Sequence, residues 1–213
     1  MKKILSVILV IAVVALGYMC YTSISTPVKF NSEQAKREAL IQKQLKKIAE
    51  LEDAFKNVNR RYATSDELKA FLQTGKVYYI NAKGDYTDQM REDGLSEQAA
   101  AAKGLIQRDT VWVSAQDSLL GEYPSVDAVF SVAGFEEKSV DIQTATIEQI
   151  IGTDTIPVSV FQAAVPMEIY LHDLDAKILA NKVAEAKARY NGKGYPGLAI
   201  GSLEEVKNTG NWE

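Results

Sequence analysis

The chain has 213 residues, of which 46% are apolar and 24% are charged, and these values are ordinary for a globular protein. The formal net charge of −4 is unevenly distributed: residues 1–62 carry 11 Lys and Arg against 5 Asp and Glu, whereas residues 63–213 carry 13 against 23. The acidic part argues against nucleic-acid binding, which needs a basic surface. The one cysteine, Cys20, lies in an apolar run, so the sequence offers no intrachain disulfide and no cysteine-based metal site.

The N-terminus consists of two lysines followed by an uncharged run over residues 4–21. These 18 residues are just long enough to cross a bilayer as a helix, at about 1.5 Å per residue. A basic start before an apolar run is typical of an export signal and favours a cytoplasmic N-terminus, although Lys29, Lys36 and Arg37 reduce the charge asymmetry. We therefore expect residues 1–21 to be a signal anchor that crosses a bacterial inner membrane once, with the domain in the periplasm.

Two other interpretations of the N-terminus remain open. A signal peptide could be cleaved after the small-x-small sequence Ser23-Ile24-Ser25. A lipoprotein would carry its lipid on Cys20, but Tyr18 and Met19 stand where such a site has small residues. The intact mass of the membrane-extracted protein would distinguish the uncleaved anchor from the cleaved signal.

A linker is predicted over residues 22–31, and an amphipathic stem helix, capped by Asn31 or Ser32, over residues 32–62. The larger apolar residues of this helix recur every 3.5 residues on average, the period of a helix that buries one face. We call the following set the stem stripe: Ile41, Leu45, Ile48, Leu51, Phe55 and Val58. Two interpretations are open, because the stripe can pack on the chain's own domain or bind a partner helix or second copy.

A short helix and a strand follow the stem. Thr64 and Glu67 have the spacing of a capping box, and Gly75 is the expected helix end. The sequence "KVYYINA" is rich in β-branched and aromatic residues, which predicts a strand.

This N-terminal layout resembles that of type IV pilin-like proteins, including the pseudopilins of secretion systems. The resemblance covers about residues 1–80: a basic start, one apolar helix, an amphipathic continuation with "AFKNVNRRYATSDEL", and then a sheet. It implies a structural subunit held by an anchor helix. Lys3 stands where pilins have a glycine before the apolar run, and residues 4–21 lack the glutamate that pilins keep there. Prepilin cleavage and the filament contact of that glutamate are therefore not implied. The C-terminal "YPGLAIGSLEEVKNTGNWE" is similar to envelope proteins of Bacteroidota, which implies no activity.

Residues 63–213 are predicted to form an acidic α+β domain with a mainly antiparallel sheet and a C-terminal helix, because short strands dominate without regular βα alternation. Further strands are expected at "RDTVWVSA", "VDAVFSVAG", "EEKSVDIQTATIE", "DTIPVSVFQAAV" and "PMEIYL". Helices are expected between Ser96 and Gly104 and over residues 174–190, the latter capped by Asp173.

No constellation of residues points to catalysis. His172 is the only histidine, and with Asp173 and Asp175 it offers too few ligands of the kinds that zinc sites use. The acidic loop "GDYTDQMRED" lacks the glycine that a calcium loop has at its sixth position. G-x-S-x-G, Walker A and H-E-x-x-H motifs are absent from the sequence. We therefore predict no catalytic residue, no metal, no cofactor and no enzymatic activity.

The glycines Gly192, Gly194 and Gly197 have G-x-G-x-x-G spacing, which is typical of dinucleotide-binding loops. Such a loop follows a strand and begins a helix, whereas here the predicted helix comes first and the strand-like "GLAIG" follows. We interpret Gly192 as a left-handed helix stop and Tyr195-Pro196-Gly197 as a turn.

Two hypotheses for function follow. The first is a non-enzymatic, membrane-anchored structural or assembly subunit of an envelope complex, which contacts the membrane and a protein partner or second copy through the anchor and stem. The alternative is a membrane-displayed domain that binds a small ligand or glycan, which predicts a deep apolar pocket. Aromatic residues that could line a ligand surface are Tyr78, Tyr79, Trp112, Tyr195 and Trp212.

Overall fold

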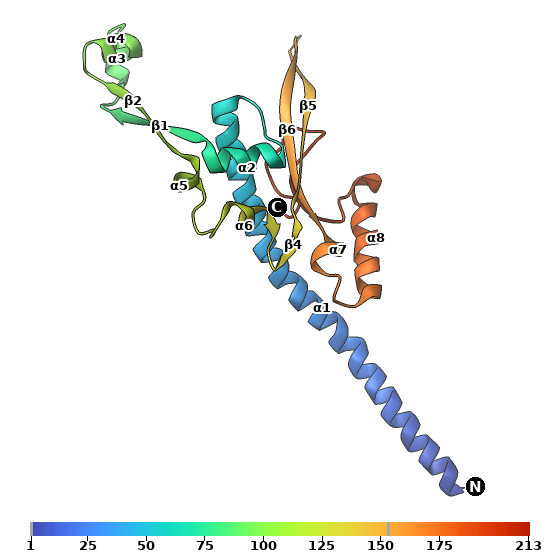
Figure 1. The fold of residues 1–213 in the computed structure, drawn as a ribbon. Helices are drawn as coiled ribbons and strands as arrows, with labels where there is room; N and C mark the ends of the chain where they lie inside the picture. Colours follow the sequence, from blue (N-terminus) through green and yellow to red (C-terminus); the bar gives the residue numbers. More distant parts are fainter. Residues whose placement is uncertain (1, 153) are drawn as a thin grey trace.

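One helix organises the molecule. In the computed structural model, which describes residues 2–152 and 154–213, helix α1 runs without interruption over Lys2–Asn59. Its 58 residues span about 87 Å at 1.5 Å per residue. The N-terminal half projects away from the domain and the C-terminal half runs through it (Figure 1). The chain therefore has a long N-terminal helix joined directly to a small domain of helices and antiparallel sheets.

The linker predicted over residues 22–31 is wrong, because these residues continue α1. Pro27 lies inside the helix, where it removes one backbone donor. The segment contains no glycine and has helix on both sides, so extending the helix avoids the cost of a new nucleus. Phe30, which is 2% exposed, already belongs to the domain core. The predicted cap at Asn31 or Ser32 is likewise wrong, since both residues lie within the helix.

The C-terminal half of α1 forms one wall of the core. Helix α2 (Ser65–Thr74) packs against it through Leu68, Phe71 and Leu72, and the rings of Phe55 and Phe71 meet edge to face with centroids 5.2 Å apart. The capping box of Thr64 and Glu67 is confirmed. The buried Gln44 joins α1 to the middle of the chain, because its amide donates to the carbonyls of Val129 and Ser131 and accepts from the amide of Ala133.

The central sheet is antiparallel, with strand order β5–β6–β7. Its strands are β5 (Asp141–Ile151), β6 (Asp154–Pro166) and β7 (Gly197–Gly201). Strand β7 pairs only with the C-terminal end of β6, so the far ends of β5 and β6 project as a ribbon (Figure 1). The C-terminal segment covers the other edge of β7, where the Asn211 amide donates to the Ala199 carbonyl.

A second hairpin forms an arm that extends away from the core (Figure 1). Strands β1 (Lys76–Lys83) and β2 (Gln107–Ser114) pair along their full length, and the tip carries α3 (Asp88–Glu92) and α4 (Glu97–Ala102). The strands and the helix capped by Ser96 are confirmed, whereas α3 lies in a segment predicted as loop. We call residues 76–114 the hairpin arm.

The secondary structure predicted from the sequence was wrong mainly in short apolar segments. "VDAVFSVAG" and "PMEIYL" were predicted as strands, but they contain α6 (Val126–Phe130), with β3 (Ser131–Val132) directly after it, and α7 (Met167–Tyr170). A short apolar run fits a buried helical turn as well as a strand, so its periodicity does not distinguish them. Helix α5 (Ala115–Leu119) follows β2, and strand β4 (Phe135–Ser139) pairs with β3.

The C-terminal helix is confirmed with one change at each end, and its helical backbone is lost from Arg189 rather than after residue 190. Helix α8 (Ala176–Gly192) is capped by Asp175 rather than Asp173, because the Asp175 carboxylate accepts from the amides of Lys177 and Ile178. Asp173 is engaged by Arg37 of α1 instead.

Candidate functional site

The first candidate surface is the projecting half of α1. Among the side chains whose exposure is described, its large apolar ones are each at least 60% exposed, and they are Leu9, Val10, Ile11, Val13, Val14, Leu16, Tyr18, Met19, Tyr21, Ile24 and Val28. Among the described residues, this is the one helix that is long and apolar enough to cross a membrane. Burying so much apolar surface is strongly favourable, at about 25 cal/mol per Å². The segment is therefore a candidate membrane anchor or signal sequence.

The stem stripe is not part of an exposed surface. Ile41, Leu45, Ile48 and Leu51 are each 0% exposed and Phe55 is 6% exposed, all within the core of their own domain. Val58 is partly buried against the same core. The interpretation of these residues as a partner interface is therefore corrected, because the chain's own domain already covers them.

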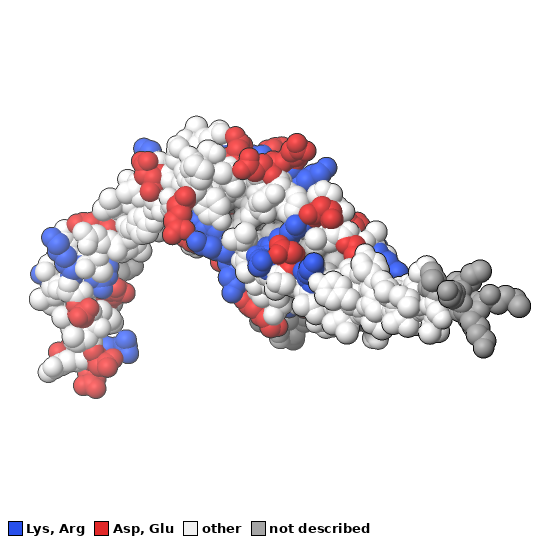
Figure 2. Space-filling view, turned by 90° about the horizontal axis from the view of Figure 1, so that it is seen from below, with Lys and Arg blue, Asp and Glu red and all other residues white. Residues whose placement is uncertain are grey.

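The basic residues of the stem also find partners within the chain. Four ion pairs cross from the stem and the turn after it to acids further along the sequence: Arg37–Asp173, Lys43–Glu122, Lys46–Glu213 and Arg61–Glu67. Figure 2 shows basic and acidic side chains intermingled where the stem meets the domain, and a largely uncharged surface along the projecting helix. The charge asymmetry of the sequence is thus partly neutralised by folding.

Asp173→Asn is expected to lower the free energy of unfolding by up to about 1 kcal/mol, because both partners are partly exposed and solvent screens the pair. The Arg37 guanidinium donates to both Asp173 oxygens, at 2.5 and 2.8 Å, and holds the pKa of this carboxyl near 2. The stabilisation is present above the usual pKa of 3.8 and is lost as pH falls through about 2. Urea unfolding at pH 7 and pH 2 measures it, and an equal effect of the substitution at both pH values would contradict this origin.

The second candidate surface is a groove of about 620 Å³ between α8 and the C-terminal segment, lined also by Gln34 and Glu38 of α1. Three aromatic side chains line it: Tyr190, Tyr195 and Trp212. Charged residues of both signs surround it, and the Lys193–Glu204 ion pair (3.3 Å) links its two sides. The groove is open and its lining is both polar and apolar, so it is not the deep apolar pocket that was expected of a domain binding a small ligand or glycan.

The five aromatic residues named from the sequence fall into two places. Tyr195 and Trp212 line the groove, whereas Tyr78, Tyr79 and Trp112 lie on the hairpin arm. On the arm, the rings of Tyr78 and Trp112 pack across the paired strands, with centroids 5.3 Å apart and planes tilted by 57°. No single aromatic surface unites the two sets.

The glycine-rich loop lines part of the groove and forms the predicted turn, but the helical backbone ends at Arg189, before the predicted stop at Gly192. The left-handed backbone starts at Tyr190 (φ 51°) and Asn191 (φ 59°), before Gly192 (φ 87°). A Cβ on Gly194 would lie 1.9 Å from the Ala186 carbonyl oxygen, so this glycine permits close backbone packing. The glycines thus serve the turn from α8 into β7.

The remaining residues considered for chemistry have structural roles. The Nδ1 atom of His172 lies 2.9 Å from the Ile169 carbonyl oxygen, and its ring packs against Phe135. Asp88 of the acidic loop pairs with Arg91 one turn later in α3. Within residues 2–152 and 154–213, no group of three or more His, Cys, Asp or Glu is placed to hold a metal ion.

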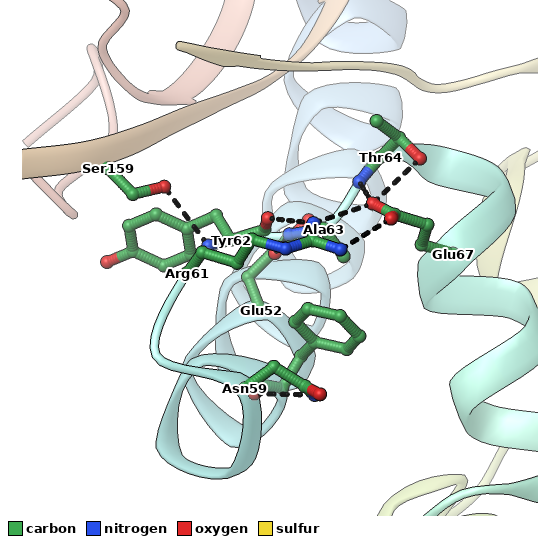
Figure 3. A network of polar contacts seen from close by, with 9 residues as sticks. Glu52, Asn59, Arg61, Tyr62, Ala63, Thr64, Glu67 and Ser159 are labelled. Carbon is green, nitrogen blue, oxygen red and sulfur yellow. Dashed lines mark hydrogen bonds and ion pairs between the residues drawn. The ribbon is translucent and has the colours of Figure 1, made fainter. Parts of the chain in front are cut away.

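One buried titratable group was missed from the sequence. Glu52 is 0% exposed, and its Oε2 atom accepts from the Ala63 amide at 2.9 Å (Figure 3). Its Oε1 atom has no hydrogen-bond partner among the described residues. Burial raises the pKa of Glu52 from 4.5 to about 7. The heptad spacing that includes Leu45 and Ile48 continues to position 52, so the sequence did carry a signal for this burial.

The turn at residues 60–63, which covers Glu52, is held by several polar contacts (Figure 3). The Arg61 guanidinium donates to both oxygens of Glu67, at 2.9 and 2.6 Å, and Glu67 also accepts from the Thr64 amide. The Tyr62 amide donates to the Ser159 hydroxyl of β6. These contacts tie the end of α1 to both α2 and the central sheet.

Comparison of the chain with family models, with curated protein sequences and with solved structures found no match. What the structure itself defines is a long N-terminal apolar helix followed by a small antiparallel sheet domain, an arrangement that is loosely pilin-like in layout.

Proposed function

We propose that this protein is a membrane-anchored structural or assembly subunit of a bacterial envelope complex, with its N-terminus in the cytoplasm and its domain in the periplasm. The observation that carries the proposal is the continuity of α1, which presents exposed apolar side chains up to Val28 and enters the domain core at Phe30. An anchor joined in this way sets the position and orientation of its domain.

The length of helix between the apolar run and the core supports a fixed position close to the membrane. Phe30 lies nine positions after Tyr21, which corresponds to a rise of about 14 Å. A flexible tether would let a domain search the space around it, whereas a continuous helix restricts that search. Fixed orientation suits a subunit whose surfaces must meet defined neighbours.

The hairpin arm is the part of the domain best suited to contact such a neighbour. Within the part of the chain that the structure describes, its two strands pair only with each other, and the exposed fractions of Tyr79, Ile80, Val111 and Trp112 lie between 47% and 61%. A two-stranded ribbon is marginally stable by itself and gains from a third strand or a packed surface. A partner bound to the hairpin arm would supply the third strand or the packed surface. The arm therefore replaces the stem stripe as the proposed contact of the folded domain.

Oxidative crosslinking through Cys20, the chain's one cysteine, tests self-association of the anchor. If anchors pack through a defined face, membranes containing the full-length protein will give a disulfide-linked dimer through Cys20. The matched control, Cys20→Ser/Thr22→Cys, carries its cysteine about 200° around the helix, and only one of the two proteins should crosslink efficiently.

Fractionation and intact mass complete this experiment. We expect the protein to stay in the membrane after an alkaline wash and to begin at its first residues. Recovery in the soluble fraction, or a mature protein starting near Thr26, would contradict the anchor. If the membrane protein crosslinked neither to itself nor to a partner, including at cysteines placed on the hairpin arm, the assembly role would be wrong.

A further inference from the structure

The groove between α8 and the C-terminal segment has no role in the proposed assembly function. Its volume of about 620 Å³ falls within the range of roughly 300–1,000 Å³ that is usual for ligand sites. We propose that this groove is a binding site for an uncharged oligosaccharide. The inference replaces the deep apolar pocket expected of a glycan-binding domain with an open groove, and it is independent of the assembly role.

The aromatic side chains provide surfaces on which sugar rings can stack. Tyr190 lines the groove and is 77% exposed, while Tyr195 and Trp212 are half-buried. Aromatic faces attract C–H groups, and the flat faces of sugar rings are lined with such groups. Three rings around one open groove therefore suit a chain of sugar rings.

The backbone conformation of Tyr190 and Asn191 favours a role for the Tyr190 ring beyond packing. Tyr190 and Asn191 both adopt left-handed backbone conformations, with φ values of 51° and 59°. This conformation is uncommon for a bulky residue and costs free energy. The Tyr190 ring is mostly exposed, so its burial within this chain offsets little of that conformational free energy.

The polar side chains at the α1 end of the groove match sugar hydroxyl groups. Glu38 accepts hydrogen bonds from Gln34 (2.7 Å) and the Tyr170 hydroxyl (3.1 Å), both on its Oε1 atom. Within the described part of the chain, neither Glu38 Oε2 nor the side-chain amide of Gln162 has a hydrogen-bond partner. A hydroxyl both donates and accepts, so a carboxylate and an amide that line the same groove provide groups for both roles.

The charges around the groove favour an uncharged ligand. Four basic and four acidic residues line it: Lys182, Arg189, Lys193, Lys207, Glu38, Glu185, Glu204 and Glu205. Two pairs are formed within the chain, Arg189–Glu185 at 3.0 Å and Lys193–Glu204 at 3.3 Å. An anionic ligand such as a nucleotide would meet as many acids as bases, so the groove gives it no electrostatic advantage.

Strand addition by a peptide is disfavoured at this groove. A bound peptide strand would need the free edge of β7, but the C-terminal segment occupies it. The Ala199 amide donates to the Asn211 side chain, and the Asn211 amide donates to the Ala199 carbonyl. An oligosaccharide does not depend on this edge, because its contacts are stacking and hydrogen bonds to side chains.

The test uses the full-length protein in a detergent without a sugar headgroup, such as lauryldimethylamine oxide. The chain has two tryptophans, so Trp112→Phe on the hairpin arm leaves Trp212 as the sole tryptophan reporter of the groove. Chitotetraose, cellotetraose and maltotetraose are titrated separately against this variant. We expect a saturable change in Trp212 fluorescence with at least one of them.

Tyr190→Asn, made in the same Trp112→Phe background, should weaken that binding at least tenfold without lowering Tm, because asparagine tolerates the left-handed conformation. The matched control is Tyr79→Asn, which removes an exposed aromatic ring outside the groove and should leave the affinity unchanged. Saturation by none of the three sugars would overturn the proposal, as would unaltered affinity in Tyr190→Asn. Equal saturation by an uncharged tetrapeptide would also overturn it and would identify the groove as a peptide site.

Discussion

Leu45→Ala is expected to lower the free energy of unfolding by about 2–5 kcal/mol, whereas Leu40→Ala should change it by about 0.5 kcal/mol or less. Both leucines lie on α1, but Leu45 is 0% exposed in the domain core and Leu40 is 58% exposed. Truncating Leu45 loses buried apolar contacts and leaves a cavity, while truncating Leu40 removes a side chain already in contact with solvent.

The comparison of the two leucines measures what covers the stem stripe. Urea unfolding of the full-length protein in detergent, followed by tryptophan fluorescence, gives both free energies. Far-ultraviolet circular dichroism is less suitable, because the projecting half of α1 contributes to the helix signal without belonging to the core. If Leu45→Ala left the domain as stable as the original and abolished association with a partner, the stripe would be an interface after all.

The free energy of unfolding is expected to fall as pH rises from about 5 to about 8. Glu52→Gln is expected to remove most of this fall. The carboxyl is fully buried, with one oxygen bonded to the Ala63 amide and the other without a partner among the described residues. Ionising it in the folded state is unfavourable, and Asp53 and Glu67 add to this cost while Arg61 opposes it. A glutamine keeps an acceptor for Ala63 and cannot ionise.

The sign follows from the pKa of Glu52, which rises from 4.5 in the unfolded chain to about 7 in the folded protein. Between these values the unfolded chain has released its proton and the folded protein has kept it, so stability falls as pH rises. The stabilising contribution is fully present below about pH 4.5 and is lost as pH rises through about 7. One pKa unit equals about 1.4 kcal/mol, so this shift changes the free energy of unfolding by roughly 3 kcal/mol.

Unfolding free energies at pH 5, 6, 7 and 8 test this prediction. Glu52→Gln should be more stable than the original protein at pH 8 by about 1–3 kcal/mol, and similar to it near pH 5. The matched control is Glu50→Gln, two residues earlier on the same helix, where the side chain is 58% exposed and pairs with Lys47. A pH profile that Glu52→Gln leaves unchanged would show that another group is responsible.

Local patterns identified several elements because their causes are local. The capping box of Thr64 and Glu67, the strand at "KVYYINA" and the turn after α8 each depend on residues within one or two turns of chain. The patterns were less reliable where several conformations satisfy the same local preference. "PMEIYL" forms α7 because of its place between β6 and α8, which its six letters do not encode.

The candidate sites were only partly predictable for the same reason. Tyr195 and Trp212 could be named as aromatic residues, but their meeting with Gln34 and Glu38 joins segments more than 150 residues apart. Glu52 continues the heptad spacing of an apolar stripe, yet its burial depends on the turn at residues 60–63 folding back over it.

The sequence by itself determined the apolar N-terminal segment, the period of the stem stripe and the alternation of short elements after it, because composition and spacing act along the chain. Only the tertiary structure decided that α1 is continuous through residues 22–31, that the stripe faces its own domain, and that the stem's basic residues meet the domain's acids. An amphipathic helix specifies that a face must be buried, whereas the identity of the covering surface is set by contacts between segments far apart in the chain.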